Sequence, residues 1–152
     1  MQLEVKINLI LHATEDENKI LEKLEENFGI EEEKFQIEQI PGHFNNPILL
    51  ISSQLKRKSA HNFVSLFFSK MKKDEFQEIF DDVENFVTSS GLSLRISKQK
   101  LVSGSLTISK EDTIKINIST PVYVKNEKKK IYQELMKMWS IDHLIIFTRD
   151  SR

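Results

Sequence analysis

The sequence predicts a single α+β domain, with a mainly antiparallel sheet of about five to six strands and helices packed on one face. Three observations support this prediction. Several short segments alternate apolar and polar residues, as half-buried strands do. Others place apolar residues at every third or fourth position, as amphipathic helices do. The connections are short, which favours antiparallel pairs, and 152 residues suffice for one core spanning residues 1–152.

The first strand and the first helix meet at an acidic joint. Residues 3–11 alternate in the manner of a strand with one buried face, and His12 follows them. Thr14 and Glu17 have the spacing of a capping box, in which each side chain satisfies a backbone N–H group at the start of a helix. Apolar residues at helical spacing follow, and we expect the helix to stop at Gly29.

Two further strands and two helices come next. We expect strands at residues 34–40 and 48–55, separated by a loop, and then two amphipathic helices separated by a break at residues 72–75. Each helix carries an apolar stripe rich in phenylalanine, which we assign to the core. The stripes comprise Phe63, Val64, Phe67, Phe68 and Met71 in the first helix, and Phe76, Ile79, Phe80, Val83, Phe86 and Val87 in the second.

The period of two returns after Gly91. It predicts three strands, at residues 92–97, 100–108 and 112–119. Their outward positions are expected to carry Arg95, Lys98, Lys100, Lys110 and Lys115. A last helix is expected near 126–139, followed by a short apolar strand at 144–147. The buried side of that helix is expected to hold Ile131, Leu135, Met138 and Trp139.

The composition excludes several kinds of site. Without cysteine, the chain has no disulfides, thiolate metal sites or cysteine nucleophiles. No two of its four histidines have helical ligand spacing, so we expect no metal. A phosphate-binding loop, a nucleophile elbow and a dinucleotide-binding turn are all absent from the sequence, so we expect no cofactor and no catalysis.

The distribution of apolar residues argues against membrane contact. No apolar run is long enough to span a bilayer, and the first residues carry charges unlike those of a secretory signal. We therefore expect a cytoplasmic protein.

Charge is segregated along the chain, although the net charge is only −1. Residues 1–55 hold 4 basic and 11 acidic residues, and residues 56–152 hold 18 basic and 12 acidic residues. This pattern suggests an acidic face and a basic face in the folded molecule, and a basic face suits a polyanion such as RNA. The alternative is that the two faces neutralise each other, within one molecule or between the subunits of a homodimer.

The loop PGHFNNP, at residues 41–47, combines an aromatic ring with several hydrogen-bonding groups. Proline at both ends restrains it. His43 or Phe44 could stack on an unpaired RNA base while Asn45 and Asn46 contact the edge of that base. The alternative is a plain strand connector with Phe44 turned inward.

The segment LRISKQK, at residues 94–100, places cations on one strand and on the turn after it. Arg95 can fork onto a phosphate, and Lys98 and Lys100 supply point charges. Gln99 can both donate and accept hydrogen bonds. The alternative is a solvated strand face.

Three motifs occur in a fixed order along the chain: HATED after the first strand, GHxxNP before the third, and LRxxKQ followed by Gly104. Together with the acidic turn at Asp112, they resemble an archaeal family that is described as RNA-binding and often as an exosome subunit. The fold of that family is similar to the ribosomal protein that binds 5S rRNA. The resemblance covers about residues 3–120. Ser97 departs from the aspartate that is usual in the family's strand motif.

The resemblance implies a non-catalytic RNA-binding protein, with RNA and exosome or ribosome-related proteins as partners. Motif and residue chemistry together give ten candidate RNA-binding residues. They are His12, Thr14, His43, Phe44, Asn45, Asn46, Arg95, Lys98, Gln99 and Lys100.

Two other functions stay open. The chain could be an assembly subunit that docks on a protein or dimerises without contacting RNA. It could also be a small phosphoesterase that uses His12 and His43, which requires the two rings to lie close together.

Overall fold

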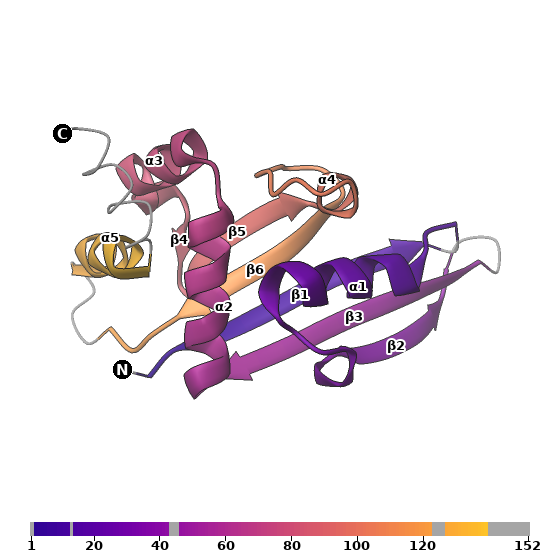
Figure 1. The fold of residues 1–152 in the computed structure, drawn as a ribbon. Coiled ribbons are helices and arrows are strands. Elements are labelled where there is room, and N and C mark those ends of the chain that lie inside the picture. The colour runs from indigo at the N-terminus through magenta and orange to yellow at the C-terminus, as the bar shows by residue number, and fades with distance from the viewer. Residues whose placement is uncertain (1, 13, 43–45, 123–126, 140–152) are drawn as a thin grey trace.

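The computed structural model of the chain describes residues 2–12, 14–42, 46–122 and 127–139. Six strands and five α-helices lie within these ranges (Figure 1). In chain order they are β1 (Glu4–His12), α1 (Glu17–Phe28), β2 (Gln36–Pro41), β3 (Pro47–Lys56), α2 (Arg57–Lys70), α3 (Lys73–Asp81), β4 (Val87–Thr88), β5 (Gly91–Ser97), α4 (Lys98–Val102), β6 (Thr113–Ser119) and α5 (Lys128–Trp139). Short 3₁₀ turns occupy Glu32–Lys34 and Val83–Asn85.

The strands form one sheet in the order β2-β3-β1-β6-β5-β4, and every neighbouring pair is antiparallel. The α+β fold class is therefore confirmed. The order places β1 at the centre, between β3 and β6, although β3 ends at Lys56 and β6 begins only at Thr113. The long-range pairing of β1 with β6 brings residues 4–8 beside residues 115–119.

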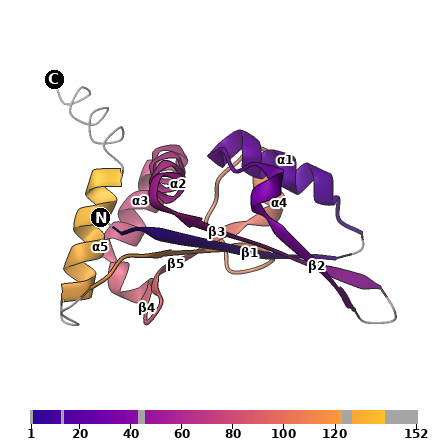
Figure 2. The same ribbon diagram turned by 90° about the horizontal axis from the view of Figure 1, so that it is seen from below.

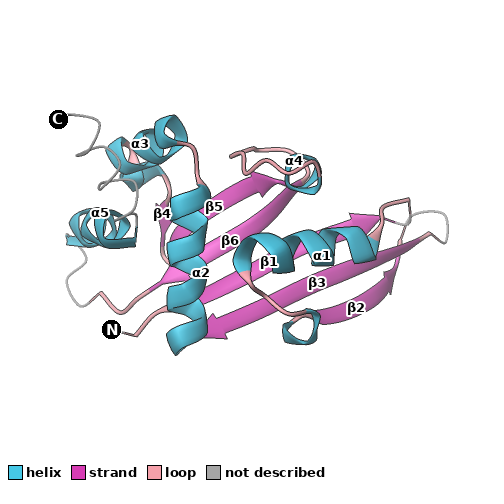
Figure 3. Ribbon diagram, viewed as in Figure 1, coloured by secondary structure: helices cyan, strands magenta, loops and turns pink. Residues whose placement is uncertain are grey.

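Helices cover one face of the sheet. In Figures 1 and 3, α1 and α2 lie in front of the strands, and Figure 2 shows α1, α2 and α4 on the same side. Strand β1 buries every second residue against them, from Val5 to Leu11, and exposes Lys6, Asn8 and Ile10 between them. This is the alternation expected of a sheet with one covered face and one face open to solvent.

The core lies between the sheet and its helices, with the phenylalanines of α2 packed against α1. The ring of Phe63 lies 5.1 Å from that of Phe28 and 5.5 Å from that of Phe67. The predicted stripe of α2 is confirmed, because all of its members are buried, including Met71 just after the helix. The second predicted helix is shorter than expected. It ends at Asp81, and the chain continues through a 3₁₀ turn into β4.

The capping box predicted for the first helix is wrong. Asp16, not Thr14, is the N-cap of α1, and its carboxylate accepts a hydrogen bond from the backbone N–H of Lys19 at 3.2 Å. The helix begins later than the motif suggests because the chain first turns back on itself, with the N–H of Glu15 donating to the carbonyl of His12 at 2.9 Å. The predicted stop at Gly29 is confirmed, with a left-handed φ of 68°.

The strand predicted at residues 100–108 is also wrong. Helix α4 begins at Lys98, where the hydroxyl of Ser97 accepts from the backbone N–H of Lys100 at 3.1 Å. Its helical turn buries Leu101, which the alternating pattern had assigned to a strand. In place of the predicted strand pairing, the structure has an isolated β-bridge between Ile108 and Ile96.

Helix α5 confirms the last predicted helix but not all of its buried side. Tyr132, Leu135, Met136 and Trp139 are buried, whereas Met138 is 55% exposed. The buried residues follow the i, i+3, i+4, i+7 spacing of one helical face, and Met138 lies off that face. The strand predicted at 144–147 lies outside the described residues.

Candidate nucleic-acid interface

The open face of the sheet carries a compact group of polar side chains on its central strands. We call this group the polar platform. It consists of Lys6 and Asn8 on β1, Lys115 and Asn117 on β6, and Ser93 and Arg95 on β5. Each of these residues lies between two buried residues of its strand, so its side chain is on the face opposite the helices.

Strand register fixes the neighbours on the polar platform. Lys115 lies directly opposite Arg95 on one side and Asn8 on the other. Asn117 lies between Lys6 and Ser93 in the next row. Two cations directly opposite each other on adjacent strands repel. Among the described residues neither Arg95 nor Lys115 forms a salt bridge, so their charges are available to an anion.

The amide of Asn117 is held in place. Its side-chain oxygen accepts from the hydroxyl of Ser93 at 2.8 Å, and its amide nitrogen donates to the carbonyl of Ser90 at 3.0 Å. At the margin of the polar platform, Lys6 lies 3.9 Å from the carboxylate of Glu4. The polar platform thus combines cations with oriented hydrogen-bonding groups.

Two shallow hollows meet on the polar platform. One, of about 810 Å³, extends over Arg95 and Lys115 toward His12. The other, of about 760 Å³, extends from the same two cations toward Asn117 and the turn between β4 and β5. Both volumes fall within the range of ligand-binding clefts. A chain-like ligand that lies across both would pass directly over the cation pair.

Two of the predicted site residues lie on this face. Arg95 is part of the polar platform, and exposed His12 lines the larger hollow at the end of β1. Thr14, Gln99 and Lys100 are exposed but line neither hollow. Gln99 instead lines a small hollow beside Leu11 and Ile20, two residues whose side chains are buried on the helix side.

Lys98 is not an outward cation, and the prediction that placed it there is wrong. The residue is only 2% exposed, and its amino group donates to the carbonyl of Ile10 at 2.6 Å. The same nitrogen lies 2.9 Å from a carboxylate oxygen of Glu15 and 2.9 Å from one of Asp112. A buried ammonium requires such partners. Its charge is therefore neutralised inside the protein.

The buried contact joins two of the three sequence motifs to the acidic turn. Glu15 comes from HATED, Lys98 from LRxxKQ, and Asp112 from the acidic turn. We call these three residues the lysine clasp. It joins the end of β1 to the start of α4 and to the turn before β6. Asp112 has a left-handed φ of 48°, a conformation that aspartate tolerates better than most residues.

The predicted base-binding loop lies between the paired strands β2 and β3. Strands β2 and β3 pair up to Pro41 and Pro47, so the motif connects two strands, as both interpretations of it require. A Cβ atom on Gly42 would lie 2.1 Å from the carbonyl oxygen of Asn46, so glycine is needed there for close approach. His43, Phe44 and Asn45 lie outside the described residues. Of the four candidate RNA-binding residues in the motif, Asn46 is the described one, and it is exposed.

Lys6, Asn8, Lys115 and Asn117 were not among the RNA-binding residues predicted from the sequence. The alternation of each strand identifies them as outward residues. The alternation does not reveal the strand order, which places β1 beside β6 and β6 beside β5.

The described His, Asp and Glu side chains form no group of three that could hold a metal ion. Within the described ranges, every helix is too short or too polar to span a bilayer.

Comparison with known proteins relates the chain to one family. A family model described as RNA binding matches residues 4–120. The RNA-binding protein PAB1135 of Pyrococcus abyssi is 27% identical over 142 residues, which cover 89% of this chain and 91% of that protein. The uncharacterised protein MJ0213 of Methanocaldococcus jannaschii is 27% identical over 139 residues, covering 87% and 93% of the two chains.

A solved structure has the same fold. The crystal structure of protein SSO0741 from Sulfolobus solfataricus, assigned to the family model DUF54, superposes with a TM-score of 0.73 at 26% identity. The match covers 92% of this chain and 98% of that one.

Proposed function

This chain belongs to the RNA binding family, and from that premise we propose that it binds RNA on the polar platform without catalysing a reaction on it. The observation that carries the proposal is the pair Arg95 and Lys115. These cations lie directly opposite each other on an open sheet face, with no salt bridge among the described residues.

A phosphate between the two cations would remove their repulsion. Arg95 can form two parallel hydrogen bonds to phosphate oxygens, and Lys115 adds a point charge. Lys6, in the next row, is placed for a neighbouring phosphate. Phosphate contacts of this kind position a nucleic acid without selecting its sequence.

The amides of the polar platform would supply contacts to bases or sugars. Asn8 lies opposite Lys115, and no side-chain hydrogen bond of Asn8 occurs within the described ranges. Both its donor and its acceptor are therefore free for a base edge or a 2′-hydroxyl. An open, shallow face of this kind favours a strand whose bases are unpaired, because paired base edges are not accessible from a flat surface.

Fluorescence anisotropy tests the proposal. We expect Arg95→Ala and Lys115→Ala each to weaken binding of a labelled single-stranded RNA about fivefold or more at low salt. Lys19→Ala is the matched control, since it removes one exposed positive charge from α1, on the covered side. Equal affinities of the wild type and both platform variants would place RNA elsewhere on the molecule.

The absence of catalysis is tested with the same RNA. After long incubation with the purified protein, we expect the RNA to remain full length on a denaturing gel. Cleavage that is lost with His12→Ala would instead support the phosphoesterase hypothesis. His12 lines the larger hollow, so a bound strand would come within its reach.

We also propose that the chain associates with an exosome, with ribosome-related proteins or with a second copy of itself. One observation supports a protein contact on the open face. Ile10 is 49% exposed and lies opposite Leu50, next to the polar platform. A dimer through this face would cover Arg95 and compete with RNA. Light scattering of the protein with and without RNA tests this, since a dimer that dissociates when RNA is added is the expected sign of competition.

A further inference from the structure

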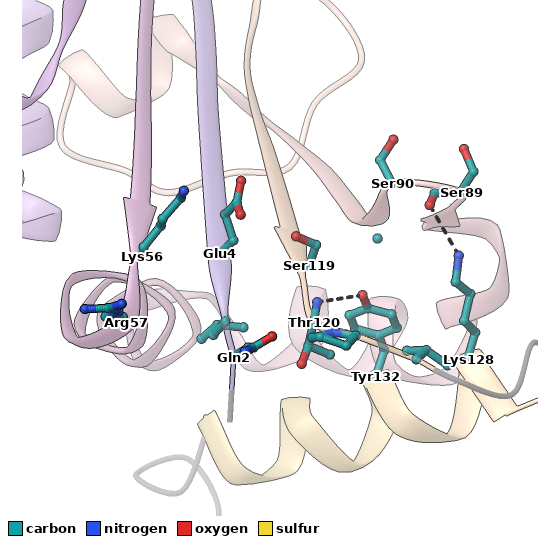
Figure 4. Close-up of a pocket in the computed structure, with 14 residues that line it drawn as sticks. Gln2, Glu4, Lys56, Arg57, Ser89, Ser90, Ser119, Thr120, Lys128 and Tyr132 are labelled. Atoms are coloured by element: carbon teal, nitrogen blue, oxygen red, sulfur yellow. Dashed lines mark hydrogen bonds between the residues drawn. The ribbon is translucent and has the colours of Figure 1, made fainter.

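A pocket of about 580 Å³ lies at the opposite end of the sheet from His12. Five segments meet there: the start of β1, the joint between β3 and α2, the β4–β5 turn, the residues after β6, and α5. Figure 4 shows these segments around the pocket, with α5 along its lower side. A volume of this size suits a single nucleotide and is too small for a duplex.

The pocket carries an excess of positive charge. Lys56, Arg57 and Lys128 line it, with Glu4 as the one carboxylate. Glu4 already accepts a hydrogen bond from the amide of Gln54. The amino group of Lys128 donates to the backbone carbonyl of Thr88 at 3.0 Å and to that of Ser89 at 3.5 Å, the second of which is drawn in Figure 4. These bonds orient the lysine without neutralising it. Within the described ranges, the three cations lack a carboxylate partner.

Neutral donors complete the lining. Ser89, Ser90, Ser119 and Thr120 supply hydroxyl groups. The hydroxyl oxygen of Tyr132 accepts from the backbone N–H of Thr120 at 3.3 Å, so its own proton can be donated into the pocket (Figure 4). Burial raises the pKa of Tyr132, and the hydroxyl therefore stays protonated at neutral pH. Cations with several hydroxyl donors are a typical environment for phosphate oxygens.

The pocket is continuous with the polar platform. Ser89, Ser90 and Ser119 line both the pocket and the platform hollow of about 760 Å³. A strand that passes over Arg95 and Lys115 toward the β4–β5 turn would therefore arrive at the pocket. Beyond it, α5 and the start of β1 form the far wall (Figure 4).

We propose that this pocket binds the phosphate monoester of a terminal nucleotide, at the end of an RNA strand that lies on the polar platform. The inference rests on the proposed function for the source of the ligand, but the chemistry stands by itself. A terminal phosphate monoester carries a charge of about −2 near pH 7, one more than the diester linkages along the strand. A pocket with three cations and one engaged carboxylate favours the more highly charged group.

Competition with a labelled reporter RNA tests the proposal. The competitors are one unlabelled single-stranded RNA with a 5′-phosphate, with a 3′-phosphate, or with neither. We expect one phosphorylated form to compete about tenfold better than the form with two hydroxyl ends. The double variant Lys56→Gln/Arg57→Gly should lose this advantage. Because Arg57 has a left-handed φ of 55°, glycine at that position relieves backbone strain and preserves the fold.

Arg95→Ala separates the two proposals. We expect it to weaken binding of all three competitors while leaving the preference for the phosphorylated end. Equal competition by all three RNAs with the wild type would overturn the assignment of the phosphate to an RNA end and leave RNA binding on the polar platform intact.

A free nucleoside monophosphate tests the pocket without RNA. If it raises the melting temperature of the wild type but not of the double variant, the phosphate chemistry is supported. If the free nucleotide binds as tightly as the phosphorylated RNA, the ligand of the pocket is a free nucleotide and not an RNA end. If neither the nucleotide nor a phosphorylated RNA end distinguishes the wild type from the double variant, the pocket proposal is wrong.

Discussion

Lys98 differs from the exposed lysines of this chain in being enclosed by the lysine clasp. Its two carboxylate partners, Glu15 and Asp112, are 27% and 43% exposed, so water shares their charge. Removing the buried partner of an ion pair typically costs about 3–5 kcal/mol, and we expect the lower end here because the carboxylates are partly hydrated.

The first prediction follows from this contact. Lys98→Met should lower the free energy of unfolding by about 3 kcal/mol, as measured by urea denaturation. Lys100→Met, two residues along and exposed, should change it by less than about 0.5 kcal/mol. If the two variants were equally stable, the lysine clasp would have no structural role.

Sequence alone could not separate Lys98 from Arg95. Both are long cations in one short segment, and both were predicted to lie outward. What separates them is the start of α4 at Lys98, which ends the strand alternation and turns that side chain inward. Its partner Glu15 lies 83 residues earlier in the sequence, and its partner Asp112 lies in the turn before β6. No local sequence pattern therefore identifies these two carboxylates.

Tyr132 gives a prediction for alkaline pH. Burial raises its pKa above the ordinary value of 10.0, so the folded state holds the proton more tightly than the unfolded chain does. Below pH 10 both states are protonated and Tyr132 adds no pH dependence. Above it the unfolded state ionises first, so stability should fall as pH rises through this range.

Absorbance of the phenolate at alkaline pH measures this shift. The chain has two tyrosines, so the variant Tyr123→Phe reports on Tyr132 alone. We expect its midpoint in the folded protein to lie above that of the urea-unfolded protein. Coincident midpoints would contradict the burial of the hydroxyl group.

Strand β5 begins with Gly91, where a side chain would collide with the neighbouring strand β6. Gly91 has a φ of 126°, and a Cβ atom there would lie 2.4 Å from the backbone carbonyl oxygen of Ile118. Gly104 also has a positive φ, 97°, but a Cβ atom would meet nothing within 4 Å. These two glycines form a matched pair, because they separate backbone strain from crowding.

We expect Gly91→Ala to destabilise the protein by about 3 kcal/mol or more, since the strand must shift away from β6. Gly104→Ala should cost about 1 kcal/mol, from its backbone conformation alone. Thermal unfolding of the two variants measures the difference. Equal melting temperatures would show that β5 accommodates the added atom.

Periodicity predicted most elements and missed α4 for a physical reason. Strands β1, β3, β5 and β6 bury alternate residues over most of their length, and a period of two identified them. The segment 100–108 contains Leu101 and Leu106 as its buried leucines, five positions apart, which neither a strand nor a helix requires. The N-cap at Ser97 favours a helix here. A serine at the end of a strand does not by itself predict a helix, because its side chain can form several other local hydrogen bonds.

For the whole molecule, the division into two faces determines where each charge lies. The acidic helix α1 covers one side of the sheet, and the cations of the polar platform lie on the other. Sequence predicted the outward residues of each strand and the single sheet. It could not predict the platform, because residues 6–8, 93–95 and 115–117 become neighbours through the strand order.

The most direct test of the account is the salt dependence of RNA affinity. For a single strand that contacts Lys6, Arg95 and Lys115, a plot of log affinity against log salt should have a slope of about −2. The double variant Arg95→Ala/Lys115→Ala should retain a slope of about −0.7, because one phosphate contact remains. If the variant keeps the slope of the wild type, the polar platform does not bind the RNA backbone, and the central claim fails.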